Sequence, residues 1–245
     1  MNEVFSRRFR FDFRSTTGQL RPILLSVIAV VASAPSVIAR QAEPGAQCGT
    51  ALIRAIDQHD SDAIETILKS APNLGETACP EKTTALNEAI AERMPLIAER
   101  LMLAGADVNQ TVGNGGTPLM TASWHCDDET ASLLLKRGAH VNAQDLAGYS
   151  ALMQATQMCS DGTVISMLLH AGANVNEHAT DGSTALTVAA FYGNESAVKE
   201  LVAAGADLEA KNASGETALT IARDRRIGRK PSHDRIYYFL KLLMG

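Results

Sequence analysis

TALTVAAFYGNESAVKELVAAGADLE, at residues 184–209, is the stretch that decides the fold, because both of its ends recur along the chain. The opening Thr-Ala-Leu returns, with Ser for Thr or Pro for Ala in places, at residues 50, 84, 117, 150 and 217. Segments related to the closing Gly-Ala-Asp-Leu-Glu begin at Gly105, Gly138 and Gly172. Both motifs recur at steps of 33 or 34 residues and in one phase, so the chain carries an internal repeat.

Each repeat reads as two short helices joined by a turn. Thr or Ser ahead of the Ala-Leu or Pro-Leu pair can start a helix, because its hydroxyl accepts a hydrogen bond from an unpaired backbone N–H. The apolar runs Leu133-Leu134-Leu135 and Met167-Leu168-Leu169 mark the second helix, and a glycine such as Gly138 ends it. One such pair cannot bury its apolar face alone, so the repeats are expected to stack on one another.

The period and the Thr-Pro-Leu phrase resemble the ankyrin repeat. The resemblance covers residues 48–245 and implies an all-α solenoid of about six helix-turn-helix repeats with short hairpin-like loops. The repeats are predicted at residues 48–80, 81–114, 115–147, 148–181, 182–214 and 215–245. One departure is systematic, because the histidine of the family's phrase is replaced in every repeat. The residues found there are Ile53, Asn87, Met120, Met153, Thr187 and Thr220.

Residues 1–39 have the composition of an export signal. Five arginines fall within residues 1–21, and no charge follows from Pro22 to Ala39. A positive, then apolar, then small-residue order is typical of a secretory signal peptide, so cleavage is expected after Ala39 and a linker over 40–47. An uncleaved anchor in the inner membrane is the alternative, because this uncharged segment approaches the length of a spanning helix.

The charge balance excludes some partners. The net charge is −5, from 22 Lys and Arg against 27 Asp and Glu. Without residues 1–39 the counts become 17 and 25, which leaves −8. An acidic surface argues against binding to nucleic acid or to an anionic membrane after signal cleavage. We expect a monomer in the periplasm of a Gram-negative bacterium, with secretion as a second destination.

All four cysteines follow the predicted signal, and an even count in an exported chain suggests disulfides. Cys126 and Cys159 occupy equivalent sites in adjacent repeats. Packed helices lie about 8–10 Å apart, whereas a disulfide needs Cα atoms closer than about 7 Å. The fourth repeat has one extra residue within 159–163, which could let the turn between its two helices reach the neighbouring repeat. We predict the pairs Cys126–Cys159 and Cys48–Cys79, with four free thiols as the alternative.

Large side chains gather at one position of the repeat. Two residues at the end of the first helix vary freely among ankyrin repeats, and the resemblance implies that they face a concave groove. Trp, Tyr, Met and Arg dominate binding hot spots, so these positions predict a protein-binding groove. Local packing of the aromatic rings is the alternative. The predicted partner-binding residues at these positions are Trp124, His125, Gln157, Met158, Phe191 and Tyr192, and Tyr149 joins them from the variable position just before a helix start.

The stretch Trp124-His125-Cys126 suggests chemistry when taken alone, but the repeat explains each position. No catalytic phrase surrounds it, and a metal site needs three or four ligands at suitable spacing. We predict no enzyme activity, no metal and no cofactor. The predicted function is a protein–protein interaction module that acts as an adaptor or protector of an exported enzyme. The alternatives are an immunity protein that neutralises a toxin and a secreted effector that acts on a host protein; each is an analogy from the fold.

Overall fold

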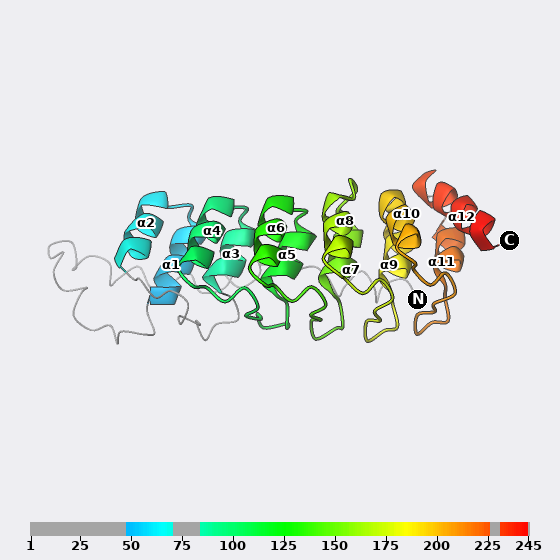
Figure 1. The fold of residues 1–245 in the computed structure, drawn as a ribbon, viewed down its shortest axis with the longest axis horizontal. Coiled ribbons are helices and arrows are strands. Elements are labelled where there is room, and N and C mark those ends of the chain that lie inside the picture. Colours follow the sequence, from blue (N-terminus) through cyan, green and yellow to red (C-terminus); the bar gives the residue numbers. More distant parts are fainter. Residues whose placement is uncertain (1–47, 71–83, 226–230, 245) are drawn as a thin grey trace, which may run out of the picture. The chain divides into compact units, whose positions relative to one another are not determined.

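The computed structural model describes residues 48–70, 84–225 and 231–244 (Figure 1). The described residues all belong to one unit, Glu43–Gly245. The predicted signal peptide and linker lie outside the described residues. Cys79 lies outside them as well, so the Cys48–Cys79 pair stays a prediction.

Twelve helices lie within the described residues, and they form consecutive pairs, which confirms the all-α repeat solenoid. The first helices of the pairs are α1 (Cys48–Asp57), α3 (Ala85–Ala91), α5 (Pro118–Trp124), α7 (Ala151–Met158), α9 (Ala185–Tyr192) and α11 (Ala218–Arg225). The second helices are α2 (Ser61–Ser70), α4 (Pro95–Leu103), α6 (Asp128–Lys136), α8 (Thr163–His170), α10 (Glu195–Ala203) and α12 (Pro231–Met244).

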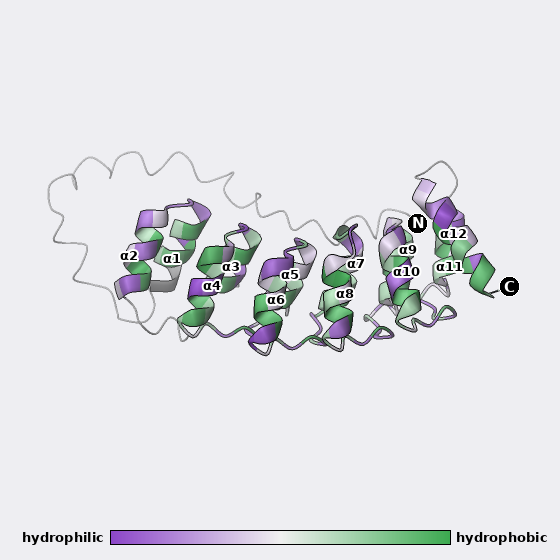
Figure 2. Cartoon of the chain, turned by 45° about the horizontal axis from the view of Figure 1, so that its top comes forward, coloured by the Kyte–Doolittle hydropathy of each residue, from purple (hydrophilic) through white to green (hydrophobic). Residues whose placement is uncertain are grey.

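The core lies between neighbouring pairs. Each first helix from α1 to α11 packs on the first helix of the next pair, and α4 to α12 form a second row in the same way (Figure 1). The leucine that follows each helix start is buried, as at Leu119, Leu152 and Leu186. Most helices carry both hydrophobic and hydrophilic segments (Figure 2), as expected of helices that bury one face.

The helix starts use the hydroxyl caps that the sequence predicts. Thr84, Thr117, Ser150 and Thr184 each accept a hydrogen bond from the backbone N–H three residues on. At the position of the family's histidine, Asn87 accepts a hydrogen bond of 3.0 Å from Thr121 Oγ1 in the next repeat. This side-chain bond links two neighbouring repeats.

A row of asparagines provides further links that sequence analysis did not anticipate. Asn109 Nδ2 donates to the carbonyl of Gly138 at 3.1 Å, and its Oδ1 accepts from the backbone N–H of His140 at 2.8 Å. Asn142 and Asn176 make the same two bonds to the following repeats. A side-chain amide carries both a donor nitrogen and an acceptor oxygen, so the Asn of Gly-Ala-x-Val-Asn can join consecutive loops through two bonds.

Replacing one of these asparagines should weaken the stack. We expect Asn142→Ala to lower the free energy of unfolding by about 1 kcal/mol, because two exposed hydrogen bonds are lost. Urea unfolding followed by circular dichroism measures the change. Glu209→Ala is the matched control, because Glu209 holds the equivalent position without an amide. Equal losses in both variants would show that the asparagine bonds contribute nothing.

Candidate functional site

Four of the five turns between first and second helices that the structure describes have one common backbone shape. A residue after the first helix takes a left-handed conformation in four repeats, with φ of 52° at His59, 56° at Arg93, 55° at Cys126 and 75° at Gly193. Cys159 holds the same place in the fourth repeat, yet it is extended, with φ −86° and ψ 104°. The extra residue of this repeat therefore lies in the α7–α8 turn and changes its path.

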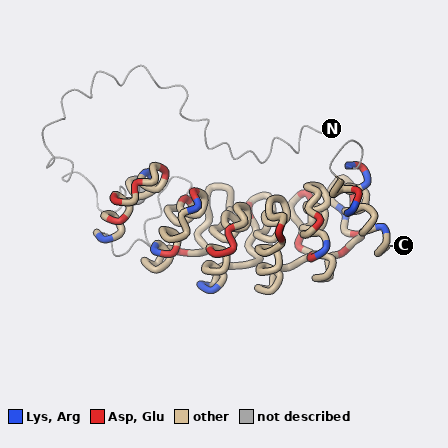
Figure 3. Tube along the Cα trace, turned by 90° about the horizontal axis from the view of Figure 1, so that it is seen from above, with Lys and Arg blue, Asp and Glu red and all other residues tan. Residues whose placement is uncertain are grey.

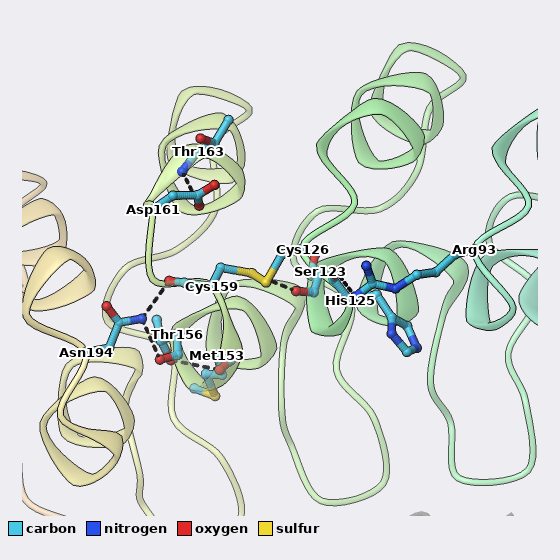
Figure 4. Close-up of a disulfide and its surroundings, with 10 residues drawn as sticks. All are labelled: Arg93, Ser123, His125, Cys126, Met153, Thr156, Cys159, Asp161, Thr163 and Asn194. Carbon is cyan, nitrogen blue, oxygen red and sulfur yellow. Dashed lines mark hydrogen bonds between the residues drawn. A yellow bond between two sulfur atoms is a disulfide. The ribbon is translucent and has the colours of Figure 1, made fainter.

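This change of path brings the two cysteines together. Cys126 and Cys159 form a disulfide with their Cα atoms 5.4 Å apart, which confirms the predicted pair (Figure 4). The turn at Cys126 has three residues, 125–127, whereas the turn at Cys159 has four, 159–162. The longer turn can reach across to the neighbouring repeat, and Gly162 completes it with φ 77°.

The α7–α8 turn is also held from the other side, by Asn194. Its Nδ2 donates to the carbonyls of Thr156 at 3.1 Å and Cys159 at 2.7 Å (Figure 4). Its Oδ1 accepts from the N–H of Ala197 and so caps α10. Sequence analysis missed this residue, although its place ahead of α10 matches that of the α6 cap Asp127 and could have revealed it.

Five of the predicted contact residues lie at least partly at the surface, on the ends of three neighbouring helices. Met158 is 52% exposed and Tyr192 is 40% exposed. Trp124, His125 and Phe191 are half-buried. Because α5, α7 and α9 pack side by side, we call these five residues the helix-end surface.

The other two predicted contact residues are buried. Tyr149 is 4% exposed and Gln157 is 8% exposed, so each presents little area to a partner. Burial, and then the carboxylate of Asp181, raise the pKa of Tyr149 above its ordinary value, as expected of a packed phenol. The structure thus places Tyr149 and Gln157 within the packing beneath the surface rather than on it.

Two arginines that the prediction left out border the helix-end surface. The guanidinium of Arg225 lies 3.2 Å from the centre of the Phe191 ring, a cation–π contact. Burial raises the pKa of Tyr192, and the charge of Arg225 partly opposes that rise. Arg93 donates to the carbonyl of His125 at 3.1 Å. Arg225 follows Tyr192 by one repeat, so the same register that selected the aromatic residues also pointed to this arginine.

The imidazole of His125 is expected to be neutral at pH 7. Burial, and then the positive charge of Arg93, lower its pKa below the ordinary 6.5. The folded state therefore binds fewer protons here than the unfolded state, so this group lowers stability as the pH falls below about 6.5. Titration followed by NMR should place the pKa of His125 below 6.5, and Arg93→Gln should raise it. A pKa above 6.5 in the unaltered protein would contradict this account.

A hollow of about 390 Å³ lies near the α7–α8 turn, lined by Ser160, residues 193–196, Lys199, Ser232 and Arg235. Lys199 and Arg235 both pair with Glu195, so the two cations already have a carboxylate partner. Among the described residues, no group of three or more His, Cys, Asp or Glu side chains could hold a metal ion. None of the described helices is long and apolar enough to cross a bilayer.

Comparison with known proteins gave one family. A family model described as ankyrin repeats, in three copies, matches residues 52–145, 86–179 and 152–229. No curated protein matches the chain. The matched segments overlap and together span most of the chain, and they include every residue of the helix-end surface.

Proposed function

Because this chain belongs to the ankyrin-repeat family, we propose that it is an exported module that binds a protein partner through the helix-end surface. Ankyrin repeats suggest a protein–protein interaction module, and the family is generally non-enzymatic. The observation that carries the proposal is the exposure of Met158 and Tyr192 beside half-buried Trp124 and Phe191 on adjacent helix ends. Large side chains of these types supply most of the binding energy at protein interfaces.

The surface is also held in place before any partner arrives. The rings of Phe191 and Tyr192 meet edge to face, with centroids 5.2 Å apart, and Arg225 covers Phe191. Side chains that are already ordered lose less entropy on binding. Residues of both charge signs are spread along the row of helices (Figure 3), which does not resemble the basic patch of a nucleic-acid-binding protein.

We propose the periplasm as the place where the protein acts. The Cys126–Cys159 disulfide supports this, because disulfides persist in oxidising compartments and are rare in the cytosol. The charge pattern of residues 1–39 supports export. Within that compartment the proposed role is that of an adaptor or protector of an exported enzyme.

Affinity capture from a native periplasmic extract tests the proposal. The triple variant Trp124→Ala, Met158→Ala, Tyr192→Ala should lose a protein that the unaltered chain retains, because it removes the large side chains from three adjacent helix ends. The matched control is Leu96→Ala with Leu103→Ala, two leucines of α4 that are 72% and 70% exposed. Circular dichroism must show that all three proteins are folded. A partner kept by the triple variant, or lost by the control, would refute the assignment of the surface.

A further inference from the structure

We propose that the Cys126–Cys159 disulfide is a redox switch for the helix-end surface. In the oxidised protein the bond fixes the ends of α5 and α7 against each other, and reduction releases the α7–α8 turn from α5. The proposal rests on the proposed function only where it assigns partner binding to this surface. The change in shape itself concerns this chain alone.

The position of the bond supports a local effect on the surface. Cys126 directly follows Trp124-His125, and Cys159 directly follows Met158. The disulfide therefore joins the two helix ends that carry three of the five surface residues. A change at either sulfur is passed to these residues through one or two peptide units.

Two residues near the ends of the joined helices bury polar atoms that lack partners. The hydroxyl of Ser123 and both amide atoms of Gln157 are buried without a hydrogen-bond partner. Buried polar groups without partners destabilise the conformation that holds them. Ser123 lies on α5 and Gln157 on α7, the two helices that the disulfide joins, so breaking the bond removes one restraint from an arrangement that these groups oppose.

The contacts of the turn give the direction of that relaxation. On the α10 side, Asn194 binds the carbonyls of Thr156 and Cys159. On the α5 side the turn is held by the disulfide, and Cys159 Sγ lies 3.2 Å from the carbonyl oxygen of Ser123. After reduction the thiol can donate only a weak hydrogen bond to that oxygen. We expect the turn to stay with α10 and to move away from α5.

The accessibility of the two sulfurs determines which of them a reductant attacks first. Cys126 is half-buried, whereas Cys159 is 1% exposed. A thiolate of a dithiol reductant attacks Cys126 Sγ, forms a mixed disulfide and expels Cys159 as a thiolate, which takes up a proton. The second thiolate of the reductant then attacks the mixed disulfide and releases Cys126. The reductant leaves as a cyclic or internal disulfide, so two electrons pass to the protein.

The full chain can report this change without a partner. Trp124 is the only tryptophan, two residues from Cys126, so its emission follows the end of α5. Dithiothreitol should shift that emission and speed amide hydrogen exchange over residues 157–163 by about tenfold. Exchange within α9 and α11 should not change. The double variant Cys126→Ala, Cys159→Ala should match the reduced protein and give no response to dithiothreitol.

Two outcomes would overturn the switch. Emission and exchange that are the same before and after reduction would show that the disulfide only stabilises the fold. A response to dithiothreitol that persists in the double variant would show that the change arises elsewhere. Neither outcome bears on partner capture, so failure of the switch and failure of the proposed function can be told apart. Once a partner is captured, reduced protein that binds it as tightly as oxidised protein would refute the regulatory role.

Discussion

Replacing Cys126 and Cys159 together by alanine is expected to lower the free energy of unfolding by about 3–4 kcal/mol. The two cysteines are 33 residues apart, so the disulfide removes much of the freedom of the unfolded chain. The cost is larger than that of a typical surface substitution, which stays within about 0.5 kcal/mol. Urea unfolding of the oxidised protein and of the variant, followed by circular dichroism, measures the difference.

Deleting one residue of the α7–α8 turn should prevent the disulfide while both cysteines are kept. Removing Ser160 shortens the α7–α8 turn from four residues to three, the length found at Cys126. We expect Cys159 then to adopt the left-handed conformation of the other repeats, too far from Cys126 to bond. Both thiols should react with a thiol reagent under native conditions. An oxidised protein no more stable than the alanine variant, or a disulfide that forms despite the deletion, would contradict this account of the turn.

Gly148→Ala is expected to lower the free energy of unfolding by about 2–5 kcal/mol, an effect comparable with the loss of the disulfide. Gly148 has φ 78°, and left-handed backbone costs a residue with a Cβ about 1–2 kcal/mol. A Cβ there would also lie 2.7 Å from the backbone nitrogen of Thr180 and 2.9 Å from Cα of Ala179. Forcing backbone apart in this way typically costs about 1–3 kcal/mol more. The displaced Thr180 donates to the carbonyl of Ala147, so the contact between two loops is disturbed.

Gly172→Ala is the matched control for this substitution. Gly172 has φ 88°, but a Cβ there would meet no atom within 4 Å. Gly172→Ala should therefore lower the free energy of unfolding only by the cost of a left-handed backbone, about 1–2 kcal/mol. The difference between the two variants in urea unfolding measures the close approach of consecutive loops. Equal losses of unfolding free energy in the two variants would show that the close approach of consecutive loops does not add to the cost at Gly148.

Local patterns of the sequence were enough to predict the fold. The cap hydroxyls of Thr117 and Thr184 and the terminating glycines act within a few residues, and the period is visible by comparing the chain with itself, so all three can be recognised without a structure. The Cys126–Cys159 pair was also predictable, because equal register places the residues opposite each other and the extra residue supplies the reach. Nothing in the register predicted that Cys159 would be extended.

The site was predictable only in part, because the repeat register gives the position of a residue along a helix but not how deeply its side chain is buried. Gln157 and Met158 are consecutive, yet one is buried and the other is exposed. Tyr149 directly precedes the helix start at Ser150 and packs inside, as Ser183 does at the same place in the next repeat. The contact of Arg225 with Phe191 depends on the distance between two repeats, which no single repeat reveals.

Photo-crosslinking from Met158 tests the central claim most directly. A photoreactive phenylalanine analogue in place of the exposed Met158 should crosslink, in the native compartment, to a single protein and lose that product when Tyr192 is changed to alanine. The same analogue in place of Leu96, which is more exposed, should give no such product. A product from Leu96 but not from Met158, or none that depends on Tyr192, would show that the helix-end surface is not the binding site.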